Sequence, residues 1–233
     1  MPDIFTCDAP PAIAIAVRDN VPDSLLKQAV DEGADFIELR VDTFENKRVD
    51  AVRDFARRAS VLPRIGTVRS KEESGGWLAS EGERLACYLA FMDIFEAVDI
   101  EIAAREIRDD VIAAAHEAHR PVIASYHDFV CTPSLSLLRE RVAEARQAGA
   151  DLVKVATMCE DPRDVRTLAA LLVEECDQGI IVLGMGPLAT VTRLAFPAMG
   201  SRITYTSDGI ALAPGQMDLS TTVRLMRELG VRP

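Results

Sequence analysis

The feature that most constrains the fold is a regular alternation of short apolar runs with longer stretches of helical periodicity. The first run, residues 11–17, reads PAIAIAV, and a helical stretch follows it. The predicted strands are residues 11–17, 36–41, 62–68, 97–102, 121–126, 151–157, 180–184 and 203–206. The predicted helices are residues 25–30, 49–59, 81–94, 106–118, 134–148, 162–175, 188–196 and 219–229.

Residues that favour helix ends support these boundaries. Asp161, Pro187 and Asp218 stand where helices should begin, and Gly33 and Gly149 stand where helices should stop. Apolar strands that alternate with helices indicate a parallel sheet covered by helices. The pattern therefore predicts an α/β protein with eight strand–helix units.

Two parallel architectures fit this pattern, a closed barrel and an open doubly wound sheet. Eight units in 233 residues, near the usual barrel length of about 250, favour the (β/α)₈ TIM barrel. No G-x-G-x-x-G follows the first predicted strand, which lowers the dinucleotide-binding alternative. With 48% hydrophobic residues and no change of composition along the chain, we expect one domain over residues 1–233.

The charge balance excludes several classes of partner. The chain has 26 basic and 37 acidic residues and a net charge of −11, which argues against binding to nucleic acid or to an anionic membrane. Its five cysteines are scattered without a C-x-x-C pair, so we expect reduced thiols and no metal site. Without a signal-peptide pattern or a run of about 18 apolar residues, we expect a cytoplasmic protein.

Lys154 is the most unusual residue, because it lies within the predicted strand DLVKVAT, which is otherwise largely apolar. Burial of an unpaired ammonium costs several kcal/mol, so such a lysine has either a carboxylate partner or a chemical use as an amine. One interpretation is a rim lysine that reaches solvent. The other is a nucleophile that forms a Schiff base with a ketone. This segment alone does not decide between them.

Other polar residues fall at the carboxyl ends of predicted strands, where barrel enzymes carry their sites. Glu38 and Arg40 share one strand face, and they could form a structural ion pair or bind a polyhydroxylated ligand. His127 directly follows the fifth predicted strand, next to the strand of Lys154, and Asp99 on the fourth strand could fix its tautomer.

A lysine and a histidine on neighbouring strands predict a definite chemistry. The amine would condense with a ketone, and the imidazole would move the protons of condensation and dehydration. The class includes aldolases, dehydratases and related lyases. Arg40, Arg69 and Arg193 would bind an anionic substrate and lower the lysine pKa.

Taken together, these segments resemble the type I 3-dehydroquinate dehydratases of the shikimate pathway. The matching segments, which cover most of the chain in family order, are Glu38-Leu-Arg-Val-Asp42, Thr67-Val-Arg-Ser70 with Glu73, Asp99-Ile-Glu101, Ser125-Tyr-His-Asp-Phe129, Val153-Lys-Val-Ala156, Thr192-Arg193 and Ala213-Pro-Gly-Gln216. Each segment alone is a weak signal, and seven in register are a strong one.

The resemblance implies a role for each candidate residue. Lys154 would form the imine with the C3 ketone of 3-dehydroquinate, and His127 would act as general base and acid. Loss of the C1 hydroxyl would give 3-dehydroshikimate and water. Glu73 would assist His127, and Asp99 would orient it. Arg193 would hold the substrate carboxylate. The residues implied to hold the ring hydroxyls are Glu38, Arg40, Arg69 and Gln216. The resemblance implies no metal or organic cofactor, and it implies a homodimer.

One position departs from the family pattern, because Leu212 stands where members carry a serine before Ala-Pro-Gly-Gln. A leucine cannot donate that hydrogen bond, so either Ser207 or Thr206 substitutes through a rearrangement of the loop or the segment 207–216 closes less well as a lid, and the sequence does not decide between them. Two alternatives to the dehydratase are another Schiff-base barrel, such as an aldolase, and a non-catalytic barrel that binds a sugar acid. The first does not predict the His-Asp-Phe and Ala-Pro-Gly-Gln segments together, and retention of Lys154 and His127 counts against the second.

Overall fold

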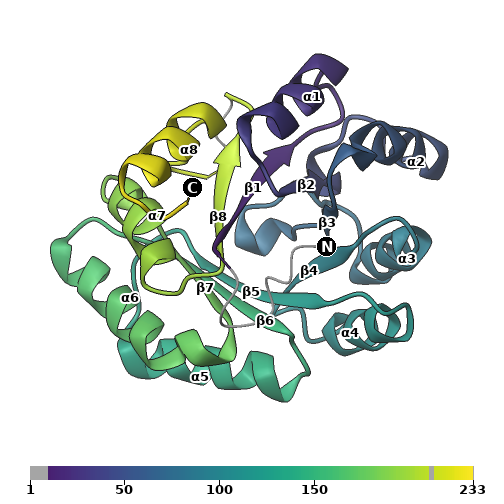
Figure 1. Ribbon diagram of the computed structural model, residues 1–233. Helices are drawn as coiled ribbons and strands as arrows, with labels where there is room; N and C mark the ends of the chain where they lie inside the picture. Colours follow the sequence, from purple (N-terminus) through teal and green to yellow (C-terminus); the bar gives the residue numbers. More distant parts are fainter. Residues whose placement is uncertain (1–9, 210–212, 233) are drawn as a thin grey trace.

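The computed structural model describes residues 10–209 and 213–232. Eight parallel strands form its centre: β1 Ala12–Val17, β2 Phe36–Arg40, β3 Arg64–Thr67, β4 Ala97–Glu101, β5 Val122–Asp128, β6 Leu152–Met158, β7 Ile180–Met185 and β8 Ile203–Ser207. Eight α-helices follow the strands: α1 Asp23–Glu32, α2 Val49–Arg58, α3 Glu81–Phe91, α4 Arg108–Glu117, α5 Leu135–Gln147, α6 Pro162–Glu175, α7 Ala189–Ala198 and α8 Leu219–Glu228. Figure 1 shows the helices arranged as a ring around the strands.

The strands form a nearly closed barrel. Their order is β7-β6-β5-β4-β3-β2-β1-β8, so strands that follow one another in sequence are neighbours, and β1 pairs with both β2 and β8. Ile180, the first residue of β7, forms an isolated bridge with Ser201, two residues before β8. This bridge joins the two ends of the sheet. The predicted (β/α)₈ barrel is confirmed, and the open doubly wound sheet is excluded.

The element boundaries differ from the predicted ones by a few residues. Strand β3 begins at Arg64 because Pro63 has no N–H to donate to the sheet. Strand β5 extends to Asp128, so His127 lies inside the strand and pairs with Ala156 of β6. Two predicted helix starts are true N-caps, since the side chains of Asp161 and Asp218 accept backbone N–H groups of α6 and α8.

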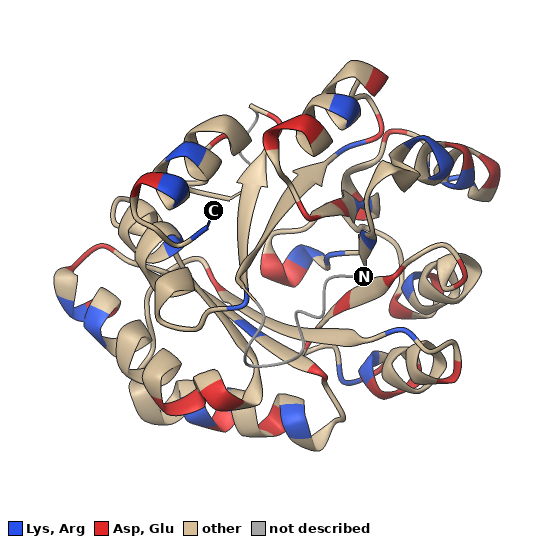
Figure 2. Cartoon of the chain, in the orientation of Figure 1, with Lys and Arg blue, Asp and Glu red and all other residues tan. Residues whose placement is uncertain are grey.

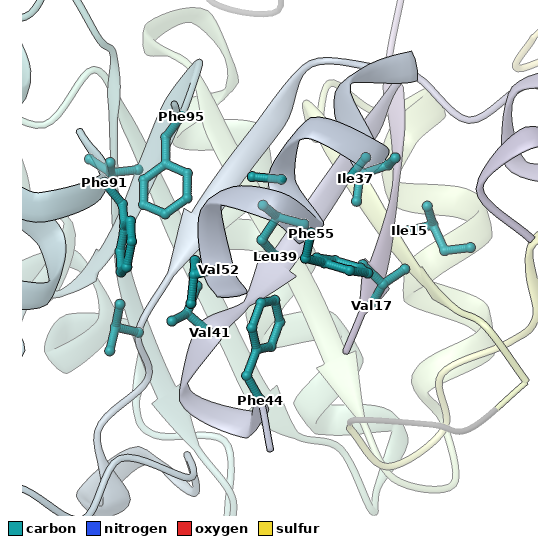
Figure 3. Close-up of a cluster of buried hydrophobic side chains, with 14 of the residues drawn as sticks. Ile15, Val17, Ile37, Leu39, Val41, Phe44, Val52, Phe55, Phe91 and Phe95 are labelled. Carbon is teal, nitrogen blue, oxygen red and sulfur yellow. The ribbon is translucent and has the colours of Figure 1, made fainter. Parts of the chain in front are cut away.

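The core has two layers because successive strand residues point to opposite faces. One layer lies between strands and helices. Figure 3 shows part of this layer, where Ile37 and Leu39 of β2 lie near Phe55 of α2. The rings of Phe44 and Phe55 pack edge to face, with their centroids 5.3 Å apart. The second layer lies inside the barrel and includes apolar residues from the amino ends of the strands: Ala12, Phe36, Ile65, Ala97, Ile123, Leu152, Ile181 and Ile203. Polar side chains, among them Glu38, Asp99 and Lys154, lie nearer the carboxyl ends of the strands.

Gly66 on β3 is required by the packing of the outer layer. A Cβ atom at this position would lie 2.2 Å from the ring of Phe95, well inside van der Waals contact. The ring therefore packs directly against the strand backbone, which fixes β3 relative to its neighbour β4.

The charged side chains lie mainly outside the barrel. Figure 2 shows acidic and basic residues spread over the outer helices and their connecting loops. No helix within the described ranges is long and apolar enough to cross a membrane. The four described cysteines, Cys87, Cys131, Cys159 and Cys176, are all free thiols.

Candidate active site

Lys154 lies in the middle of β6 with its side chain inside the barrel, on the same face as Leu152 and Ala156. It is only 5% exposed, so the interpretation as a rim lysine that reaches solvent is wrong. Its Nζ lies 3.0 Å from Asp99 Oδ2 and 3.9 Å from Glu38 Oε1. The ammonium is therefore buried between two carboxylates.

Asp99 on β4 is fully buried, and it connects Lys154 to Arg69. Its Oδ1 accepts hydrogen bonds from Arg69 Nη2 at 2.7 Å and from Ser125 Oγ at 2.6 Å. Burial by itself would raise the pKa of the Asp99 carboxyl, but the charges of Arg69 and Lys154 hold it well below its usual range. Asp99 is therefore a permanent negative charge beside the amine.

This network continues outward to the third helix. Glu101, also on β4, lies 3.2 Å from Arg69 Nη1 and accepts the backbone N–H of Ser70 at 2.7 Å. Its second oxygen accepts from Arg84 Nη1 of α3 at 2.6 Å. The position of Arg69 is thus fixed by a chain of buried ion pairs that begins on an outer helix.

His127 is paired with Glu73, which lies at the end of a short 3₁₀ turn after β3, Lys71–Glu73. Glu73 Oε2 is 2.7 Å from His127 Nδ1 and accepts the backbone N–H of His127 at 3.1 Å. Burial raises the pKa of Glu73 to about 8, despite the charge of Arg69. Burial, Arg69 and Lys154 lower the pKa of His127 well below its ordinary value. The imidazole is therefore neutral near pH 7.

Asp99 was expected to orient His127, but among the described residues the direct hydrogen bond to the imidazole comes from Glu73. Glu73 occupies the Nδ1 side of the imidazole, and no hydrogen bond joins Asp99 to His127 in the part of the chain that the structure describes. The physical reason is the reach of the amine: Lys154, two strands from Asp99, extends across the barrel and takes the free oxygen of that carboxylate.

The three predicted arginines differ in their partners. Arg40 forms a two-point hydrogen-bonded ion pair with Asp42, at 2.8 and 2.9 Å, and not with Glu38. Arg69 is engaged by Asp99 and Glu101. Arg193 has no acidic partner among the described residues, and its Nη1 donates to the backbone oxygen of Tyr205 at 3.1 Å.

Arg193 is accordingly the arginine most available to an anion. It is 2% exposed, and burial lowers its pKa to about 10. Its Nε is buried without a hydrogen-bond partner in residues 10–209 and 213–232. A buried guanidinium with an unused donor is strongly favoured to bind a carboxylate.

Eight of the nine predicted site residues surround one cavity of about 60 Å³ at the carboxyl ends of the strands. They are Glu38, Arg40, Arg69, Glu73, His127, Lys154, Arg193 and Gln216. The ninth, Asp99, lies beneath the cavity in contact with Lys154. Glu38 is held by Thr67 Oγ1 at 2.9 Å, and Gln216 Nε2 donates to the backbone oxygen of Thr206 at 2.8 Å. The departure at Leu212 lies outside the described residues.

The sequence interpretation missed the apolar and aromatic wall of this cavity. Leu183 and Met185 of β7 and Tyr205 of β8 line it. Strand parity offered a signal for Tyr205, because it shares a face with Ile203 and so points into the barrel. The arrangement as a whole joins a buried amine, a neutral imidazole and a guanidinium without an acidic partner among the described residues, a set suited to capture an anionic ketone and remove a proton next to the carbonyl.

The family model and the curated relatives point to one family. The model of the family described as "Type I 3-dehydroquinase" matches residues 14–233. The 3-dehydroquinate dehydratase of Methanococcoides burtonii is 34% identical over 229 residues, covering 95% of this chain and 97% of the relative.

Two solved structures are also similar. The 3-dehydroquinate dehydratase of Aquifex aeolicus has a TM-score of 0.84 at 30% identity, covering 93% of this chain and 98% of the other. The type I 3-dehydroquinate dehydratase of Clostridium difficile, solved with covalently modified comenic acid, has a TM-score of 0.87 at 26% identity, covering 96% and 94%.

Proposed function

The chain belongs to the type I 3-dehydroquinase family of hydro-lyases, and from that premise we propose that it dehydrates 3-dehydroquinate through a Schiff base on Lys154. The observation that carries this proposal is the buried Lys154 amine, which shares one cavity with the His127–Glu73 pair and Arg193.

The first stage is imine formation. Lys154 gives up one proton, with His127 as the base, and the neutral amine attacks the C3 carbonyl of the substrate to form a C–N bond. The carbinolamine oxygen takes one proton from the nitrogen and one back from His127, and it leaves as water. The nitrogen is then a positively charged iminium.

The second stage is the dehydration. His127 removes a proton from C2, and the electron pair moves into the iminium to give an enamine. The enamine expels the C1 hydroxyl, which takes the proton from His127 and leaves as water. Water then hydrolyses the iminium, which releases 3-dehydroshikimate and restores Lys154.

The remaining residues hold the substrate. Arg193 takes the carboxylate, since its Nε has no other partner in the described chain. Glu38, Arg40 and Gln216 bind ring hydroxyls. The Nη atoms of Arg69 already contact Asp99, Glu101 and Ser125, so we infer that Arg69 contributes mainly its charge and its hold on Asp99.

Trapping the imine tests the function. Borohydride in the presence of 3-dehydroquinate should reduce the C=N bond to a stable secondary amine, and mass analysis should find the adduct on the peptide that contains Lys154. Lys71, on the loop beside the site, is the internal control. An adduct on Lys71 alone, or no adduct, would contradict the proposal.

The pH dependence of kcat/KM should report the Glu73–His127 pair. Below pH about 8 a protonated Glu73 donates to Nδ1, which leaves Nε2 protonated and unable to accept. As pH rises through about 8, ionised Glu73 accepts from Nδ1–H, and Nε2 becomes a free base. We therefore expect kcat/KM to rise with pH through this range and Glu73→Gln to lose that rise, with kcat lowered about 10²-fold.

Glu72→Gln, one residue away on the same turn, is the matched control for this measurement. A pH profile of Glu73→Gln that keeps the rise near pH 8 would show that another group titrates there.

We further infer that the chain forms a single catalytic domain over residues 1–233, acts in the shikimate pathway in the cytoplasm, and forms a homodimer. The pathway and the dimer follow from the family, and the free thiols suit a reducing compartment. Sedimentation equilibrium tests the oligomeric state, and a mass of one 25.4 kDa chain would exclude the dimer.

A further inference from the structure

The aromatic ring of Tyr205 lies against the nitrogen of Lys154. Lys154 Nζ is 4.1 Å from the ring centroid, well within the roughly 6 Å over which a cation is attracted to an aromatic face. Tyr205 pairs with Ala14 of β1 in the sheet and is 5% exposed, so the ring is fixed inside the barrel. Its neighbours leave little water to screen the interaction.

The three partners of the nitrogen differ in what they need from it. Asp99 accepts a hydrogen bond from Nζ at 3.0 Å, and Glu38 lies 3.9 Å away as an ion-pair partner. The ammonium of Lys154 offers three N–H donors. The ring is attracted to the positive charge itself and needs no N–H.

Schiff-base formation changes this balance. The ammonium loses one proton to a base, a second hydrogen leaves the nitrogen when the carbinolamine loses water, and the iminium retains a single N–H. The nitrogen of Lys154 can therefore donate fewer hydrogen bonds to Asp99 and Glu38. Both forms carry one positive charge, but the planar iminium can stack on the ring face as a planar guanidinium does, so the ring favours the iminium over the tetrahedral ammonium.

We propose that Tyr205 is a catalytic residue, whose ring face stabilises the positive charge of the iminium on Lys154 Nζ and raises the fraction of bound substrate held as Schiff base. This inference rests on the proposed function, because it requires an imine at Lys154. A more stable iminium is also a better electron sink for the removal of the C2 proton.

The phenol is in the form that this role needs. Burial, together with the charges of Glu38 and Asp99, raises the pKa of Tyr205 well above its ordinary value, so the ring is neutral. Its hydroxyl is buried and has no hydrogen-bond partner in the described ranges. The ring face is therefore the part of Tyr205 that contacts Lys154 among the described residues.

The ring can be tested without a change of shape. Tyr205→Phe keeps the ring and removes the unpaired hydroxyl, and it serves as the reference. Replacement of this phenylalanine by its mono-, di- and trifluoro analogues withdraws charge from the ring face and barely alters its size. The readout is the fraction of enzyme trapped by borohydride as the Lys154 adduct at a fixed concentration of 3-dehydroquinate.

We expect the imine equilibrium to fall stepwise with each added fluorine, by about tenfold over the series, as the cation–π attraction weakens. Tyr205→Leu should fall at least as far relative to Tyr205→Phe. The thermal unfolding temperature should be nearly constant over the fluorinated series. A merely structural role of the ring predicts this constancy too, but it does not predict a graded loss of imine.

A flat series would overturn the role of Tyr205, even if Tyr205→Leu failed to fold. That outcome differs from a failure of the proposed function, in which the wild-type chain itself gives no adduct on Lys154.

Discussion

Replacement of Lys154 by alanine is expected to abolish turnover of 3-dehydroquinate. The amine forms the covalent bond that makes the C2 proton removable, and no other lysine lines the described cavity. A nucleophile fixed beside its target has an effective concentration of about 10⁵ M or more, so kcat should fall by at least about 10⁵-fold. Steady-state kinetics and borohydride trapping should both show the loss.

This substitution also removes a charge from a buried network, so its effect on folding must be measured separately. Loss of one partner of a buried ion pair costs about 3–5 kcal/mol, although Arg69 continues to neutralise Asp99. Lys154→Arg is the matched control, since it restores the positive charge between Asp99 and Glu38 without a nucleophilic amine. If Lys154→Arg retained appreciable turnover, the covalent role of Lys154 would be untenable.

Replacement of His127 by alanine is expected to lower kcat by about 10²- to 10⁴-fold, the usual contribution of a positioned acid–base group. The amine of Lys154 remains in place, so some imine should still form and then accumulate, because removal of the C2 proton has become slow. Mass analysis after borohydride should therefore detect adduct in His127→Ala under conditions where turnover is nearly lost.

The comparison of the two variants separates the roles of the two residues. Lys154→Ala should lose imine and turnover together, whereas His127→Ala should lose mainly turnover. Equal loss of imine and turnover in both variants would refute this division of labour. His116→Ala, on the outer surface of α4, is the control for loss of an imidazole.

The sequence predicted the barrel because its physical cause is local. Each strand and helix has its own periodicity, and eight units leave little choice of architecture. The placement of Lys154 inside the barrel follows from strand parity, since Leu152 and Ala156 share its face. Parity alone could not exclude a rim position, because that depends on the height of the residue along the barrel axis.

The pairing of side chains inside the site could not be predicted in the same way. Glu73 lies in a charged, glycine-bearing loop whose composition is typical of a surface segment, and its contact with His127 depends on how that loop returns over β5. The choice of Lys154 rather than His127 as the partner of Asp99 depends on the reach of a long side chain across two strands. Neither the path of the loop nor the reach of the lysine side chain can be predicted from local periodicity.

The two halves of the barrel interior have different physical characters, apolar at the amino ends of the strands and charged at the carboxyl ends. Stability and chemistry are therefore assigned to different residues of the same eight strands. Substitutions at positions such as Ala12 or Ile203, which pair with each other on β1 and β8, can change the melting temperature while the electrostatics around Lys154 stay the same. The stability of such a barrel can change with the temperature of its surroundings while its reaction is retained, because stability and catalysis depend on different residues.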